Sequence, residues 1–163
     1  MSTNKEKGFS LIELLIVVAI ILIIAAIAIP NLLRSKMAAN EASAVASLRT
    51  YNTAIVSYQT TYGTDPSSDF SQLGPAATPT SAAADLVDNL LGSATANKSG
   101  YVFTYYPTAL SGGATVYSQY TIVADPQSFN VTGQRNFFTD QNGVIRQSTS
   151  STQSDVNSTP IGN

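Results

Sequence analysis

Gly8-Phe9-Ser10-Leu11-Ile12-Glu13 opens an apolar segment that continues through the sixteen residues Leu14–Ile29 and ends at Pro30. As a helix, the 21 residues from Phe9 to Ile29 would measure about 31 Å, which matches the hydrocarbon core of a bilayer. A charged carboxylate at the centre of a bilayer helix costs about 2.5–3.5 kcal/mol. A segment this apolar that keeps Glu13 is therefore expected to supply a partner for it.

The composition excludes several classes of function. The 163 residues fit one membrane segment and one small domain. The chain has no Cys and no His, which removes thiol nucleophiles, Ser-His-Asp relays and the usual zinc ligands, so we expect no enzyme and no cofactor. After Gly63 there are three basic residues against seven Asp, so the basic surface that nucleic-acid binding requires is not indicated.

Two ordinary interpretations of the N-terminus are an export signal and a plain membrane anchor. Ala26-Ile27-Ala28 supplies the small-residue triplet of a signal cleavage site, but the apolar run is slightly long for such a signal. A single uncleaved anchor is the second possibility. Neither interpretation gives a reason for Glu13.

The motif from Gly8 to Glu13, followed by the apolar run and Pro30, resembles the prepilin leader and N-terminal helix of type IV pilins and of the related type II secretion pseudopilins. The resemblance implies that residues 1–8 are a leader, which a prepilin peptidase removes by cutting after Gly8. Phe9 becomes the new N-terminus and is N-methylated. Glu13 then neutralises the N-terminal amine of a neighbouring subunit during assembly.

The resemblance also implies a location and partners. The chain would be a single-pass precursor in the bacterial inner membrane, in contact with lipid, and then a helical homopolymer built by pilus or type II secretion machinery. The polymer would be a cell-surface filament for adhesion or motility, or a periplasmic pseudopilus. The charges flanking the span are balanced, with Lys5 and Lys7 before it and Arg34 and Lys36 after it, so orientation comes from the resemblance alone.

A long helix is expected from Phe9 to Tyr62, because this stretch contains no Gly and one Pro. Residues 9–30 form its membrane or filament-core half, and residues 31–62 an amphipathic half that ends at Gly63. Pro30 predicts a kink or a locally melted stretch, since it removes one backbone hydrogen bond. In the amphipathic half, Tyr51, Tyr58 and Tyr62 are expected to pack against a sheet.

Residues 63–147 are expected to form a globular head, which gives an α+β, pilin-like fold. A loop over 63–84 leads to a short helix at Ser81–Leu91, with Leu86, Val87, Leu90 and Leu91 facing inward. Aromatic and β-branched runs then predict three or four antiparallel strands. The expected strands are Gly100–Tyr106, Thr115–Ala124, Arg135–Thr139 and Val144–Gln147, the last two joined by a turn at Asp140–Gly143.

Two weaker signals complete the sequence. Asp125 and Asp140 are candidate calcium ligands, although turn formation explains them more simply and no complete ligand spacing is present. Residues 148–163 are rich in Ser, Thr and Asn, which predicts a flexible tail. The paired C-terminal cysteines of many pilins are missing, which leaves pilin and pseudopilin open. An exported or membrane-tethered binding domain is the alternative from a different class.

Overall fold

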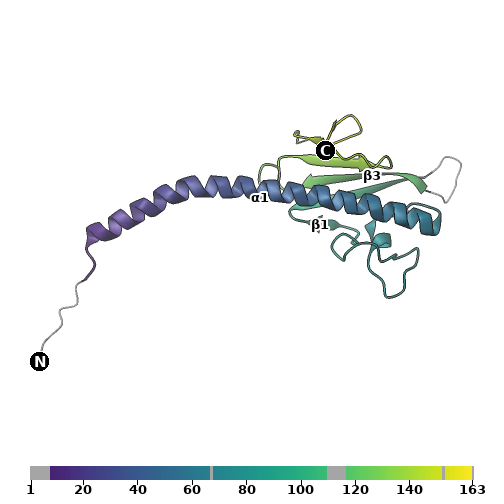
Figure 1. Cartoon of the computed structure of the whole chain (residues 1–163), viewed down its shortest axis with the longest axis horizontal. Helices are drawn as coiled ribbons and strands as arrows, with labels where there is room; N and C mark the ends of the chain where they lie inside the picture. The colour runs from purple at the N-terminus through teal and green to yellow at the C-terminus, as the bar shows by residue number, and fades with distance from the viewer. Residues whose placement is uncertain (1–7, 67, 110–116, 152, 163) are drawn as a thin grey trace, which may run out of the picture. The chain divides into compact units, whose positions relative to one another are not determined.

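The computed structural model describes residues 8–66, 68–109, 117–151 and 153–162. The chain divides into two compact units, Met1–Ser35 and Lys36–Asn163. Helix α1 begins in the first unit, and the second unit holds the rest of α1 and a β-sheet (Figure 1). The α+β class predicted from the sequence is confirmed.

Helix α1 runs over Leu11–Tyr62, 52 residues, and ends where the sequence predicts. Gly63 follows in the left-handed region, at φ 74°, and its N–H donates to the Gln59 carbonyl over 2.8 Å. Glycine adopts this conformation without the steric cost that a Cβ adds, so it closes the last turn. The helix is continuous through Pro30, so the locally melted alternative is absent from this structure, and the kink at Pro30 stays a prediction. Proline removes one backbone donor, and the helical bonds on either side maintain the helix.

The sheet has six antiparallel strands in the order β1-β2-β3-β4-β5-β6. Its strands are β1 (Ala96–Lys98), β2 (Tyr101–Ala109), β3 (Tyr117–Pro126), β4 (Asn136–Asp140), β5 (Arg146–Ser148) and β6 (Thr159–Pro160). The four predicted strands correspond to β2 to β5, with the tight turn at 140–143 closed by Gly143 N–H on the Asp140 carbonyl, 2.9 Å. The start of the second predicted strand, Thr115, lies outside the described residues.

The core of the second unit lies between one face of α1 and the sheet. Tyr51 and Tyr58 are buried as predicted, and Tyr62 is partly buried against the same cluster. The Tyr51 ring stacks on Phe70 with centroids 4.0 Å apart, and its hydroxyl donates to the Leu91 carbonyl over 2.8 Å. Large aromatic rings whose polar ends find partners fill this space without leaving an unsatisfied group.

The predicted helix at Ser81–Leu91 is wrong. This segment forms turns, and Asp85 adopts a left-handed φ of 54° that a helix cannot contain. The Asp85 N–H donates to the Gly74 carbonyl and the Leu86 N–H to the Leu73 carbonyl. The backbone of this segment therefore bonds to the 3-10 helix η1 (Phe70–Leu73) and to its C-cap, Gly74. Of the four residues expected to face inward, Val87 and Leu91 are buried and Leu86 is partly buried, whereas Leu90 is 57% exposed.

The flexible tail predicted over 148–163 is also wrong for much of that segment. β6 pairs with β5, and the Ile161 N–H donates to the Ile145 carbonyl over 2.9 Å. Ser154 is buried, and its hydroxyl donates to the Asn136 carbonyl over 2.8 Å. These hydrogen bonds attach a polar segment to the sheet. Because the segment has few apolar residues, its sequence pattern gives no indication of this attachment.

Candidate processing and assembly site

The N-terminal end of α1 is fixed by Ser10 and Glu13. Gly8, Phe9 and Ser10 precede the helix, so Ser10 is its N-cap and Glu13 is the third helical residue. The Ser10 backbone N–H donates to Glu13 Oε2 over 2.8 Å, and the Glu13 N–H donates to the Ser10 carbonyl over 3.1 Å. A glutamate at this position that accepts from the N-cap N–H is half of a capping box.

This capping role of Glu13 is absent from the sequence interpretation, which treated the residue only as a partner for an amine. The signal was present, because Ser followed three residues later by Glu before an apolar run marks a helix start. The cap also leaves the Gly8–Phe9 peptide bond outside the helix, where Gly8 and Phe9 are both exposed. Exposed backbone outside secondary structure is where proteases cut, so the geometry suits cleavage after Gly8.

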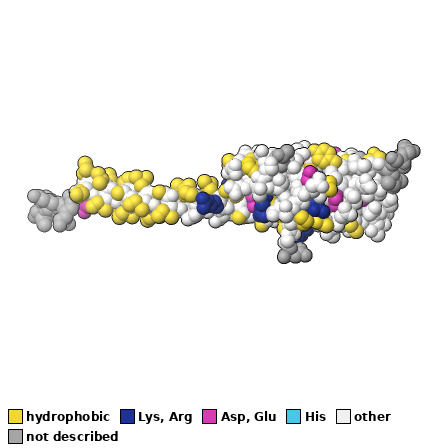
Figure 2. Space-filling view, turned by 90° about the horizontal axis from the view of Figure 1, so that it is seen from above, with side chains coloured by type: hydrophobic (Ala, Val, Ile, Leu, Met, Phe, Trp, Pro, Cys, Tyr) yellow, Lys and Arg dark blue, Asp and Glu magenta, His cyan; other side chains and the backbone are white. Residues whose placement is uncertain are grey.

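The rest of the first unit is an apolar helix without cover. Every large apolar side chain from Phe9 to Ile29 is exposed, from 46% at Val18 to 85% at Phe9. Figure 2 shows hydrophobic side chains over nearly all of this segment. Among the described residues, α1 is long and apolar enough to cross a membrane, with a mean hydropathy of 3.3 in its best window. A helix that is apolar all round is covered by lipid or by other helices.

In the second unit, Glu41 lies at the N-terminal end of the buried face of α1, 6% exposed. Arg135 binds it from the chain preceding β4, with Nη2 and Nε at 2.7 and 2.8 Å from Glu41 Oε2. The Gln134 backbone N–H donates to Oε1 over 2.7 Å, so both carboxylate oxygens are satisfied. Arg135 Nη1 also donates to Gln147 Oε1 on β5 over 2.6 Å. The pair ties α1 to β5 and to the two residues that precede β4.

The sequence interpretation missed this pair. The position of Glu41 in the helical repeat of buried residues could have indicated it. Glu41 precedes Ala44, Leu48, Tyr51 and Ile55 at the spacing of a single helix face. A carboxylate in that row is buried on folding and needs a cation and hydrogen bonds. Which of the three cations after Gly63 would supply the charge depends on the fold of the sheet.

The two calcium candidates do not come together. Asp140 pairs with Thr121 at one end of the β3–β4 ladder, whereas Asp125 lies beyond the Ala124–Phe137 pair at the other end. Four residues along a strand separate the two positions by about 13 Å. Asp140 accepts from the Asn142 N–H over 2.9 Å. This bond stabilises the turn, which is the simpler explanation inferred from the sequence for Asp140. No group of three metal-ligating side chains occurs within the described ranges.

Asp125 and Asp65 carry pKa values raised by burial. Asp125 Oδ2 accepts from Gln153 Nε2 over 2.9 Å, whereas Oδ1 is buried with no hydrogen-bond partner in the described structure. Because the folded chain holds a proton on such a carboxyl more tightly than the unfolded chain, the contribution of each of these two carboxyls to stability is greatest below its ordinary pKa of 3.8 and falls as pH rises through its raised pKa.

We expect Asp125→Asn to stabilise the protein at pH 7, because it removes a buried charge and keeps an acceptor for Gln153. The variant should also gain less stability than wild type on acidification from pH 7 to pH 4. Urea unfolding of the full chain in detergent at several pH values measures both effects. Asp65 is present in both proteins, so its effect on the pH dependence of the unfolding free energy cancels when the two proteins are compared. Parallel curves for the two proteins would contradict the assignment.

Comparisons with known proteins address the N-terminus. Residues 3–29 match the family model described as the prokaryotic N-terminal methylation motif. Over 38 residues the chain is 60% identical to the protein named type IV wide pilus major component PilA4 from Thermus thermophilus. This match covers 23% of the chain and 29% of the relative. No solved structure was found to match the chain.

Proposed function

We propose, from the premise that the N-terminal segment is that of the type IV pilin family, that this chain is a structural subunit that polymerises into a filament. A prepilin peptidase would cut after Gly8 and methylate the amine of Phe9. The single observation that carries the proposal is the uncovered apolar helix that starts with the methylation motif and holds one carboxylate, Glu13, in its first turn.

Cleavage changes the charge around Glu13. In the precursor Phe9 contributes a neutral peptide group, and the Glu13 carboxylate accepts from the Ser10 N–H. Removal of residues 1–8 creates a positively charged amine at Phe9. A buried ion is tolerated when it is paired and hydrogen-bonded, so Glu13 of one subunit pairing with the amine of Phe9 in the next would permit both to leave water. The pairing would set the register between subunits.

The apolar segment is kept out of water in both states of the subunit, in the membrane and in the filament. Before assembly, lipid of the inner membrane covers the side chains from Leu14 to Ile29, and after assembly identical helices cover them. The repeated contact is heterologous and does not close, which generates a helical polymer. Extraction from the membrane requires pilus or type II secretion machinery.

A surface pilus for adhesion or motility is the first candidate, because the relative in Thermus thermophilus is named as a pilus component. The pseudopilus of a type II secretion system is the same-fold alternative, since it uses the same N-terminal motif. An exported or tethered binding domain is the alternative from a different class. It predicts no polymer and no dependence on Glu13.

Intact-mass and N-terminal peptide mass spectrometry on protein from the native membrane and from sheared surface material tests the proposal. The expected result is a chain that begins with N-methylated Phe9, with filaments containing it in the sheared fraction by electron microscopy. The same N-terminus without surface filaments would favour the pseudopilus. A chain that begins at Ile29, or one that keeps residues 1–8, would overturn the filament proposal.

A further inference from the structure

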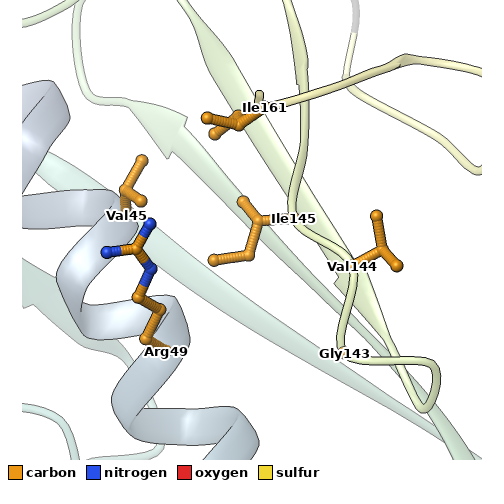
Figure 3. Close-up of a pocket in the computed structure, with 6 residues that line it drawn as sticks. All are labelled: Val45, Arg49, Gly143, Val144, Ile145 and Ile161. Atoms are coloured by element: carbon orange, nitrogen blue, oxygen red, sulfur yellow. The ribbon is translucent and has the colours of Figure 1, made fainter. Parts of the chain in front are cut away.

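The second unit has an apolar groove between α1 and the C-terminal strands. Val45 and Arg49 on α1 and Gly143, Val144, Ile145 and Ile161 line a cavity of about 330 Å³. Figure 3 shows the side chains of Val45, Ile145 and Ile161 directed toward the space between them, with the Arg49 guanidinium beside Val45 and Val144 directed away. A cavity of this size admits an aliphatic side chain. We call Val45, Arg49, Ile145 and Ile161 the groove.

Arg49 decides what kind of group fits the groove. It is exposed, and the ion pairs between described residues are Lys98 with Asp88 and Arg135 with Glu41, so none involves Arg49. A partner that covers the groove desolvates this guanidinium, which costs free energy unless a carboxylate comes with the partner. The fitting occupant therefore joins an aliphatic side chain to a nearby acid.

The loop around Leu90 presents that combination. Leu90 is 57% exposed, and the adjoining Leu91 is 2% exposed. Asp88 Oδ1 accepts from the backbone N–H groups of both leucines, at 3.0 and 2.8 Å, and Tyr51 donates to the Leu91 carbonyl. An exposed leucine on so firmly bonded a loop loses little conformational freedom on docking. We call Leu90 with Asp85 the knob.

Asp85 supplies the acid of the knob. It is exposed, and no ion pair within the described ranges involves it. Its left-handed backbone is held by the N–H bond to Gly74, 2.8 Å. Gly74 in turn packs against Gly92, where an added Cβ would lie 2.3 Å from the Gly74 Cα. The loop is therefore fixed on both sides of Leu90.

The knob loop contacts one outer strand of the sheet through Asp88, and the groove adjoins the other outer strand, while Leu86 of the same loop and Arg49 line a shared pocket along α1. Lys98 on β1 pairs with Asp88 in the knob loop over 3.2 Å, whereas Ile161 of the groove directly follows β6. β1 and β6 are the two outer strands of the sheet. A contact from one edge of a copy to the other edge of the next copy is heterologous and can repeat along a polymer.

We propose that the knob of one subunit docks in the groove of another, with Leu90 between Val45, Ile145 and Ile161 and with Asp85 paired to Arg49. The inference rests on the proposed polymerisation and names a contact between heads that supports it. The apolar run Leu14–Ile29 fits less well, because the acid beside it, Glu13, is assigned in the proposed function to the amine of Phe9. Asp155 beside exposed Val156 fits less well too, since the Asp155 carboxylate already accepts from Asn157 and Ser158.

Cysteine cross-linking tests the contact, because the natural chain has no Cys. Full-length Leu90→Cys/Ile145→Cys is expressed in the native host, and sheared filaments are oxidised and separated without reductant. We expect a ladder of covalent dimers, trimers and longer species. The single-Cys variants cannot form such a ladder, and Val131→Cys/Ile145→Cys is the matched control, since Val131 is 67% exposed outside the knob. Leu90→Cys/Val45→Cys repeats the test if Ile145→Cys fails to fold.

Charge reversal tests the ion pair separately. Arg49→Asp is expected to lower the yield of sheared filaments about tenfold, and Arg49→Asp/Asp85→Arg to restore most of it. Filaments that form normally but give no Leu90 ladder would overturn the inference and leave the proposed function intact. A ladder from Val156→Cys/Ile145→Cys without one from Leu90 would assign the groove to the Val156 turn. Absence of filaments from the wild-type chain would instead contradict the proposed function.

Discussion

Glu41→Ala is expected to destabilise the second unit by about 3 kcal/mol, near the lower end of the cost of breaking a buried ion pair. The substitution leaves the Gln134 N–H without its acceptor and Arg135 without its anion. The Arg135 side chain is 37% exposed and can turn partly to water, which limits the loss. Urea unfolding of the full chain in detergent, followed by circular dichroism, measures it.

The chain's other described ion pair provides the matched control. Lys98 and Asp88 are 32% and 53% exposed and meet over 3.2 Å. Lys98→Ala should therefore cost less than about 1 kcal/mol, the usual value for a surface pair. Equal losses for Glu41→Ala and Lys98→Ala would contradict the anchoring role of Glu41. A Glu41→Gln variant, which keeps an acceptor but loses the charge, should lie between Glu41→Ala and wild type.

Local and periodic features of this fold could be predicted from the sequence. The end of α1 at Tyr62 follows from Gly63, and the burial of Tyr51 and Tyr58 follows from helical spacing. Strands β2 to β5 are rich in aromatic and β-branched residues or adjoin a strong turn signal. In each case neighbours in the sequence carry the information.

Features that depend on distant segments could not be predicted. β1 and β6 have three and two residues, too few for any periodicity, and each exists because a neighbouring strand offers hydrogen bonds. The segment at 81–91 has a helical pattern of leucines, but its backbone bonds to residues 72–74. Glu41 lies at the helical spacing of the buried residues of α1, but its partner Arg135 is 94 residues away in the sequence. Tertiary contacts override local propensity at these places.

At the N-terminus, the two roles of Glu13 can be separated by Glu13→Gln and Glu13→Ala. Glutamine keeps an oxygen that can accept from the Ser10 N–H, so it preserves the cap seen at 2.8 Å, but it has no charge for an amine. Alanine removes both. If Glu13 acts through its charge, both variants should reduce surface filaments on the order of 100-fold, since an unpaired amine must then be buried.

Processing should continue in both variants, because the Gly8–Phe9 bond lies outside the helix and neither substitution alters it. Filament yield is measured on sheared material, and the N-terminus of membrane-bound subunits by mass spectrometry in the same cells. If Glu13→Gln assembles like wild type while Glu13→Ala does not, Glu13 serves assembly through the helix cap and the charge-pairing role is wrong. If both assemble normally, neither role matters for assembly, and the apolar helix alone must set the register of the polymer.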